Sequence, residues 1–212
     1  MSDLTVATFK IGVLLGSARP NGNCRGLEAW LYQRLQLSSP CHFELINIYP
    51  NAPMHPLGPV TEDVIPALIG ADALYATDNV NAWSALVKSC HGFIILTPQY
   101  NWGYPGDLKN ALDHLYFEWR NKPVVVVTYG GHGGGKCGEQ LRQVLSGLKM
   151  KVIERVISIT LPSEYIRESS RLTPEQFSGT DSNHGVAFEF LAEADDALAK
   201  AVEEFSIALR AP

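Results

Sequence analysis

The sequence predicts an α/β protein in which a parallel sheet of five strands carries helices on both faces. Short runs of β-branched and aliphatic residues alternate along the chain with segments whose apolar residues recur every three or four positions. The connections between these runs are also long enough for the crossover helices that parallel neighbours need. No linker, internal repeat or low-complexity stretch divides the 212 residues, so we expect one domain over 1–212.

The first elements can be placed from their patterns. An aliphatic strand runs from Ile11 to Leu15 and stops where turn residues begin at Gly16. A helix is predicted from Gly26 to Leu37, because its apolar residues fall on one helical face. A second strand covers Phe43 to Ile48, and the prolines at 50, 53, 56 and 59 then exclude regular structure for some way.

The remaining elements follow from the same rules. The segment 163–185 is the exception, because it is polar and long for a connection within a compact domain. In chain order the predicted elements are a helix at Trp83–Ser89, a strand at Gly92–Leu96, a helix carrying Leu108, Ala111, Leu112, Leu115 and Tyr116, a strand at Val124–Val127, a helix carrying Leu141, Val144, Leu145 and Leu148, a strand at Val152–Ile159 and a helix at Phe188–Leu209.

Composition and charge exclude several classes of function. The chain is 46% hydrophobic and 18% charged, as in ordinary soluble domains, and its net charge of -5 without a basic stripe argues against nucleic acid as a partner. No leader pattern or apolar stretch of about 20 residues is present, so we expect a cytoplasmic protein without a membrane partner. The four cysteines form no CxxC pair, which argues against a zinc site, and we expect no metal.

Three loops of unusual composition follow the first, third and fourth predicted strands, and the carboxyl ends of parallel strands share one edge of a sheet. The first loop, 16–24, offers Ser17, Arg19 and the N–H groups of a helix start, which suit a phosphate. A plain tight turn explains the same residues equally well. The GxGxxG spacing is absent, which argues against a dinucleotide bound through its pyrophosphate.

The second loop, 97–110, combines two prolines, several amides and the rings of Tyr100, Trp102 and Tyr104, a surface suited either to a planar polar ligand or to packing against another element. The third loop, 128–135, is rich in glycine, so its backbone can approach a ring closely. Its spacing also matches a P-loop, but Cys137 stands where that motif needs Ser or Thr. Together the three loops predict a ligand with a phosphate at one end and a flat polar ring at the other, as in flavin mononucleotide (FMN).

The sequence resembles the NADPH-dependent FMN reductase family. The stretches that carry the resemblance are TPQYNWGYPGDLKNALDHLYFEW, KPVVVVTYGGHGGGKCGEQLRQVLSGLKM and GSAR near the start. It is nearly unbroken from Gly92 to Val152, recurs at Ile11 to Cys24 and is weak after Pro162. The resemblance implies a flavodoxin-like fold with strand order 2-1-3-4-5 and a homodimer with FMN near the subunit contact. It also implies a ping-pong reaction in which NADPH or NADH gives a hydride to the flavin and a quinone collects it at the same face.

The resemblance also assigns site residues by position. His132 is a candidate catalytic residue that donates to the flavin or delivers a proton to the quinone, although a role in orienting the loop fits it equally well. Many bacterial relatives have Glu at the position of Gln99, so a carboxylate there is not part of the mechanism. The residues expected to bind the cofactor are Ser17, Arg19, Asn23 and Cys24 in the first loop, Pro98, Gln99, Tyr100, Asn101 and Trp102 in the second, and Tyr129, Gly130, Gly131, His132 and Gly133 in the third.

Alternative functions remain open at this point. An exposed flavin discriminates poorly among flat acceptors, so a reductase for azo dyes, chromate or free flavin is one alternative. Another is a flavodoxin-like electron carrier or redox sensor that docks on a protein. A yeast member of the family associates with the proteasome, so the resemblance implies that partner too. No arginine in the sequence identifies a preference for NADPH over NADH.

Overall fold

The sheet is parallel throughout and its strands lie in the order β2-β1-β3-β4-β5, with β6 also paired to β4. The computed structural model describes residues 7–49, 57–72, 74–178 and 188–211. The predicted order 2-1-3-4-5 is therefore confirmed, and with it the flavodoxin-like fold. The strands are β1 (Thr8–Leu15), β2 (His42–Tyr49), β3 (Gly92–Pro98), β4 (Pro123–Gly130), β5 (Lys151–Val152) and β6 (Ile157–Thr160).

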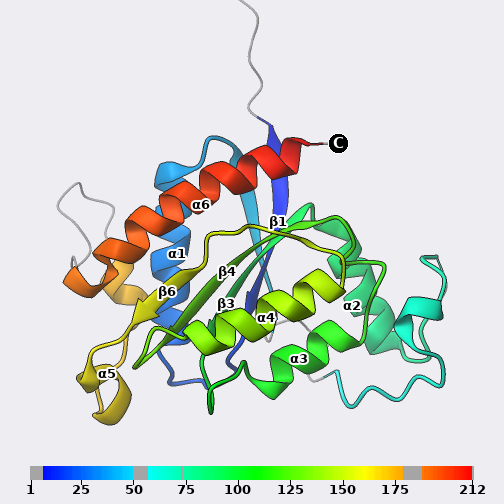
Figure 1. Cartoon of the computed structure of the whole chain (residues 1–212), viewed down its shortest axis with the longest axis horizontal. Helices are drawn as coiled ribbons and strands as arrows, with labels where there is room; N and C mark the ends of the chain where they lie inside the picture. The colour runs from blue at the N-terminus through cyan, green and yellow to red at the C-terminus, as the bar shows by residue number, and fades with distance from the viewer. Residues whose placement is uncertain (1–6, 50–56, 73, 179–187, 212) are drawn as a thin grey trace, which may run out of the picture.

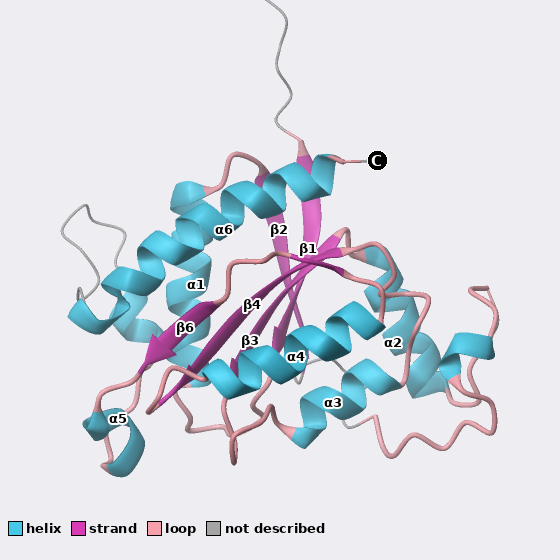
Figure 2. Cartoon of the chain, in the orientation of Figure 1, coloured by secondary structure: helices cyan, strands magenta, loops and turns pink. Residues whose placement is uncertain are grey.

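Helices cover both faces of the sheet (Figures 1 and 2). One face carries α1 and α6, and the other carries α2, α3 and α4. Short 3-10 helices lie at Pro66–Leu68, Pro174–Phe177 and Glu189–Leu191. The α-helices are α1 (Cys24–Ser38), α2 (Asp78–Ser89), α3 (Gly106–Asp113), α4 (Gly135–Gly147), α5 (Ser163–Arg167) and α6 (Ala192–Arg210).

The central strands divide the core by simple alternation. Along β4, Val125 and Val127 pack into the cluster under α1 and α6, whereas Val124 and Val126 pack into the cluster under α2, α3 and α4. Successive side chains of a strand point to opposite faces, so a strand buried on both faces reads as a continuous apolar run. This burial fixes the register of the strands whose ends carry the unusual loops.

The fifth predicted strand, Val152–Ile159, is in fact two short strands. Val152 pairs with Val124 and Ile157 with Val127, so five steps along this segment match three steps along β4 and two extra residues bulge out. The Arg142 guanidinium donates to the carbonyls of Ile153 and Glu154 at 3.1 and 2.6 Å, which satisfies the backbone that leaves the ladder. The hydrophobic periodicity of the sequence alone does not predict such an interruption of the strand.

Other elements begin or end at residues that differ from the predicted ones, for local reasons. Helix α2 begins at Asp78, before the predicted Trp83, because Thr77 caps it by accepting a hydrogen bond from the Val80 N–H at 3.3 Å. The long segment after β6 contains α5 and a 3-10 helix, while 179–187 and the prolines at 50, 53 and 56 lie outside the described residues. No helix in the described part of the chain is long and apolar enough to cross a membrane.

A buried carboxylate anchors the chain that precedes α2. Glu118 is only 4% exposed and accepts hydrogen bonds from the Tyr75 hydroxyl at 3.1 Å to each oxygen and from the Ser84 hydroxyl at 2.6 Å. The Lys88 ammonium lies 3.8 Å away. Because a buried charge needs partners, these contacts tie three separate segments together.

Candidate functional site

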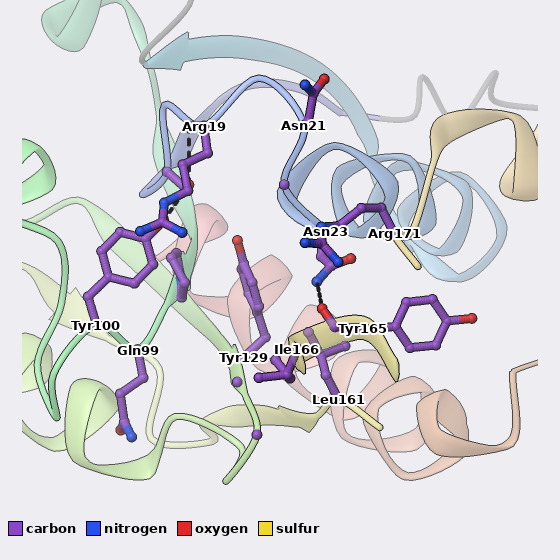
Figure 3. Close-up of a pocket in the computed structure, with 15 residues that line it drawn as sticks. Arg19, Asn21, Asn23, Gln99, Tyr100, Tyr129, Leu161, Tyr165, Ile166 and Arg171 are labelled. Atoms are coloured by element: carbon purple, nitrogen blue, oxygen red, sulfur yellow. Dashed lines mark hydrogen bonds between the residues drawn. The ribbon is translucent and has the colours of Figure 1, made fainter. Parts of the chain in front are cut away.

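A cavity of about 300 Å³ opens at the carboxyl edge of the sheet (Figure 3). The predicted loops after β1, β3 and β4 all contribute to it, as does the chain after β6. Of the fourteen residues expected to bind a cofactor, nine line this cavity: Ser17, Arg19, Asn23, Pro98, Gln99, Tyr100, Tyr129, Gly130 and Gly131.

The loop after β1 can follow its path because of one glycine. A Cβ atom at Gly16 would lie 2.1 Å from the Thr97 Oγ1, so only glycine lets the end of β1 pass so close to β3. Beyond it, the Ser17 and Tyr100 hydroxyls are 2.9 Å apart, and the Arg19 guanidinium lies 4.7 Å above the Tyr100 ring. This packing brings the first two loops together at one end of the cavity.

Helix α1 begins at the cavity with its backbone donors uncapped by a side chain. Its N-cap residue, Asn23, is instead turned toward the chain after β6, where its amide donates to the Tyr165 carbonyl at 2.8 Å (Figure 3). The same amide accepts a hydrogen bond from the Leu172 N–H at 2.9 Å. Gly26 permits this contact, since a Cβ atom there would lie 2.4 Å from the Leu172 carbonyl carbon. The N–H groups of the first turn and the helix dipole favour an anion at this end.

The charge of the lining supports the same conclusion. Arg19 and Arg171 both line the cavity, and among the described residues no Asp or Glu does. Within the described residues neither guanidinium is within 4 Å of a carboxylate oxygen. The Arg171 guanidinium donates through Nη1 to the carbonyls of Glu168 and Ser170 at 2.7 and 2.5 Å, which holds the group against its own segment and leaves its charge without a counter-ion. The site is thus cationic in a chain of net charge -5.

The glycine-rich loop forms the opposite side. The Thr128 hydroxyl donates to the Gly133 carbonyl at 3.0 Å, and the φ angles of Gly133 and Gly134 are +71° and +80°, which favour glycine. Gly130 and Gly131 line the cavity, where an added Cβ atom would meet only Gln99 at 3.7 Å or Ile166 at 3.9 Å. Their missing side chains therefore leave room for a flat ring against the backbone.

Tyr129 lies between the two sides and is 5% exposed. Its hydroxyl is hydrogen-bonded to the Cys24 thiol, and burial raises the pKa of Tyr129 well above its ordinary value. Burial also raises the pKa of the Cys24 thiol to about 11 and that of Cys137 to about 12. All three groups are protonated at neutral pH, so neither thiol acts as a nucleophile here.

Gln99 has a structural task that the sequence does not reveal. Its Oε1 accepts a hydrogen bond from the Cys137 N–H at 3.1 Å, in the first turn of α4, whose N-cap Gly134 offers no side chain. Figure 3 accordingly shows the side chain turned away from the cavity. The amide thus caps α4 and only the base of the residue faces the cavity.

Five expected residues do not line the cavity: Cys24, Asn101, Trp102, His132 and Gly133. Cys24 is buried beneath Tyr129, and Gly133 is buried behind the loop. Asn101, Trp102 and His132 are exposed at the tips of the second and third loops. Their assignment to the cofactor stays a prediction.

Two further lining residues, Asn21 and Gly22, belong to the first loop, and four that sequence reasoning missed lie after β6: Leu161, Tyr165, Ile166 and Arg171. The stretch shows no periodicity and little resemblance to the family. One signal was available, because a segment that follows a parallel strand must start at the same edge of the sheet. An arginine there is a natural candidate for a phosphate.

The donor set fits one kind of ligand. The Ser17 hydroxyl and the Arg19 guanidinium lie by the N-terminus of α1, the Arg171 guanidinium comes from the opposite side of the cavity, and the side-chain-free backbone of Gly130 and Gly131 completes the lining (Figure 3). These groups suit a phosphate and a planar ring joined by a short chain, which is the make-up of FMN.

Comparisons with known proteins agree with this geometry. The family model described as NADPH-dependent FMN reductase matches residues 9–161. An NAD(P)H-dependent FMN reductase of Saccharomyces cerevisiae is 39% identical over 171 residues, covering 76% of this chain and 90% of the relative. A quinone reductase of Escherichia coli is 30% identical over 156 residues, covering 69% and 74%. The solved flavoenzyme NAD(P)H:(acceptor) oxidoreductase of Paracoccus denitrificans shares the fold, with a TM-score of 0.61 and 20% identity over 93% of this chain and 98% of its own.

Proposed function

Because the chain belongs to the NADPH-dependent FMN reductase family, we propose that it reduces quinones with electrons from NAD(P)H in a ping-pong reaction. FMN is its cofactor and NAD(P)H its electron donor. When bound, FMN supplies the ring that takes a hydride from one substrate and gives it to the next. The observation that carries the proposal is the cavity itself, in which loops distant in sequence join a cationic end to a glycine-lined end.

We assign the cationic end to the FMN phosphate. Ser17 donates a hydroxyl hydrogen bond, Arg19 a charge-assisted one, and the first turn of α1 contributes N–H groups and the positive end of its dipole. Arg171 adds a second guanidinium from the far side of the cavity. Both cations are exposed, so a phosphate binds here without the cost of burying an unpaired charge.

We assign the glycine-lined end to the flavin ring. The backbone of Gly130 and Gly131 lies where a ring can approach it, and N–H groups there would stabilise negative charge that develops on the polar edge of a reduced flavin. Tyr129 closes the floor and Tyr100 the side. His132 remains our candidate for delivering a proton to the acceptor, because its imidazole faces solvent next to Gly131.

A quinone is the acceptor we propose. The support is the resemblance to the Escherichia coli quinone reductase, together with a site whose ring end is open to solvent. We also place the reaction in the cytoplasm, where the four free thiols of this chain would stay reduced.

We further propose that the active form is a homodimer. The segment before α2 exposes Val64, Ile65, Leu68 and Leu74, each between 47% and 83% exposed in a single chain. A cluster of exposed apolar residues is more often part of a protein contact surface than of a surface that stays in contact with solvent. Light scattering on the purified protein measures the mass, and Leu68→Glu should shift it toward the monomer.

An anaerobic stopped-flow experiment tests the reaction. We expect NADPH to bleach the flavin absorbance of the purified yellow protein within the turnover time, and menadione added afterwards to restore it. A protein that bleaches but recovers only with azo dyes, chromate or free flavin would contradict the quinone assignment. A protein that NADPH and NADH leave yellow is an electron carrier or sensor and would contradict the enzymatic function.

A further inference from the structure

Two aromatic rings project into solvent beside the cavity, and the proposed function does not use them as a pair. Trp102 is 61% exposed, and its ring centroid lies 5.9 Å from that of His132, with 34° between the ring planes. The rings belong to different loops. They meet because β3 and β4 are neighbours in the sheet, with Pro98 opposite Tyr129, and each loop turns within a few residues of that pair.

The backbone beneath Trp102 adopts a conformation that its side chain disfavours. Tyr100 and Gly103 exchange two backbone hydrogen bonds, at 2.8 and 2.9 Å, around a two-residue turn. The φ angles of the two residues within it are +46° for Asn101 and +70° for Trp102. Asn tolerates this region, but the second position of such turns strongly favours Gly. A bulky ring at a strained, solvent-exposed position points to a function rather than to packing.

The turn is also held in place. The Gln140 side chain donates to the Trp102 carbonyl at 3.3 Å from helix α4. On the other loop, His132 sits in the middle of a tight turn closed by a 3.2 Å hydrogen bond from the Gly133 N–H to the Gly130 carbonyl. Both rings are thus presented on short, hydrogen-bonded turns, which keeps their relative position defined.

The size of the cavity limits where a second reactant can bind. A volume of about 300 Å³ is at the lower end of the range for ligand sites, so it accommodates one ligand. An electron acceptor must then approach the flavin from the outer edge of the loops that carry Gly131 and Tyr100. The two exposed rings stand at that edge, one residue after Gly131 and two residues after Tyr100.

We propose that Trp102 and His132 form a stacking platform that binds the flat ring of the electron acceptor at the rim of the cavity. The inference rests on the proposed function and names the part of the site that selects the acceptor: planar, aromatic or quinonoid rings bind there, and compact acceptors without a flat face do not. Offset stacking on an indole and an imidazole supplies the attraction.

Fluorescence gives a test that needs no turnover. The other three tryptophans, Trp30, Trp83 and Trp119, are fully buried, so Trp102 is the exposed one of the chain's four. Menadione added to the oxidised, FMN-loaded protein without NAD(P)H should quench a saturable part of the emission, and Trp102→Phe should remove that part. An emission that acrylamide cannot reach in the loaded protein would mean that a second subunit covers Trp102, and would overturn the proposal.

Steady-state kinetics give the second test. Trp102→Asn keeps a residue that tolerates positive φ but removes the ring, and we expect the KM for menadione to rise about 2- to 12-fold relative to the KM for ferricyanide, which has no flat face. This range corresponds to the 0.5–1.5 kcal/mol typical of aromatic pairs. Trp102→Phe keeps an aromatic ring, so its KM for menadione should stay close to that of the parent. Ile207→Asn, at a 68% exposed position on α6, serves as the matched control and should change neither KM.

Variants of His132 separate the platform from proton delivery. His132→Phe keeps a ring and should keep the KM for menadione, whereas His132→Ala should raise it. A fall in kcat with an unchanged KM in both variants would make His132 a proton donor and overturn its place in the platform. An unchanged KM in Trp102→Asn overturns the whole proposal. If the parent protein does not reduce menadione at all, the proposed function fails, while the quenching titration still decides whether the platform binds flat rings.

Discussion

The two guanidinium groups of the cavity give the most direct test of how the cofactor is held. Arg19 comes from the loop after β1, which the sequence identifies, and Arg171 from the segment after β6, which it does not. Both side chains are exposed, and neither has a carboxylate partner within the described residues. Arg19 packs on the Tyr100 ring and Arg171 bonds to carbonyls of its own segment, so replacing either by alanine should lower the free energy of unfolding by no more than about 1 kcal/mol.

The effect on FMN should be much larger. A hydrogen bond between a guanidinium and a phosphate contributes roughly 1.5–3 kcal/mol, so Arg19→Ala should weaken FMN binding about 10- to 150-fold. Quenching of FMN fluorescence by the apoprotein, titrated at fixed ionic strength, measures the dissociation constant. Arg171→Ala should fall in the same range. If both groups contact one phosphate, the free-energy changes in the double variant should depart from additivity by more than about 0.5 kcal/mol.

The matched control is Arg155→Ala, since Arg155 pairs with Glu204 on the surface at 3.3 Å and lines no part of the cavity. It should bind FMN as the parent does. An Arg19→Ala protein with the parent's dissociation constant would refute the assignment of the phosphate to this end of the cavity. If Arg19→Ala weakens FMN binding by the full expected factor and Arg171→Ala does not weaken it, only the first loop contacts the phosphate.

Three further predictions concern stability. Gly26→Ala places a Cβ atom against the backbone of the segment after β6 and should lower the free energy of unfolding by about 1–3 kcal/mol in urea titrations, whereas Gly147→Ala, with nothing within 4 Å, should not. Glu118→Gln should cost about 1–3 kcal/mol in the same assay because two hydroxyl donors lose their carboxylate, and the exposed Glu139→Gln should stay within about 0.5 kcal/mol. Burial raises the pKa of Cys137 from 9.0 to about 12, so its contribution to stability is complete below pH 9 and is lost as the pH rises toward 12; the pH profiles of the parent and Cys137→Ala should diverge only in that interval.

The parts of the fold that the sequence predicts are those where one local signal dominates. The run at 124–127 is apolar because β4 is buried on both faces, and burial of that kind leaves few alternatives. The edge of the sheet behaves differently. The bulge between β5 and β6 depends on the Arg142 guanidinium, which reaches it from α4, so no pattern within 152–159 encodes it.

The candidate site also has parts that the sequence predicts and parts that it does not. Loops such as 16–24 and 128–135 can be identified from their unusual composition alone. Because parallel strands end at one edge of the sheet, the sequence also predicts that these loops lie close together. Gln99 lines the cavity, but its amide also caps α4, a role that its position in the motif does not reveal. Arg171 lines the cavity although the sequence does not single it out. It belongs to a stretch without periodicity, and it becomes recognisable only when the contacts of Asn23 bring that stretch over the start of α1.

The two hydrogen bonds of Asn23 have an evolutionary consequence. They make a segment about 145 positions further along the chain a structural part of the phosphate loop, since one side chain holds both Tyr165 and Leu172. Substitutions in that segment can alter how long the cofactor stays bound while the loop that contacts the phosphate keeps its sequence. Related chains that share the first loop but differ after β6 should therefore share a cofactor and differ in how readily they release it.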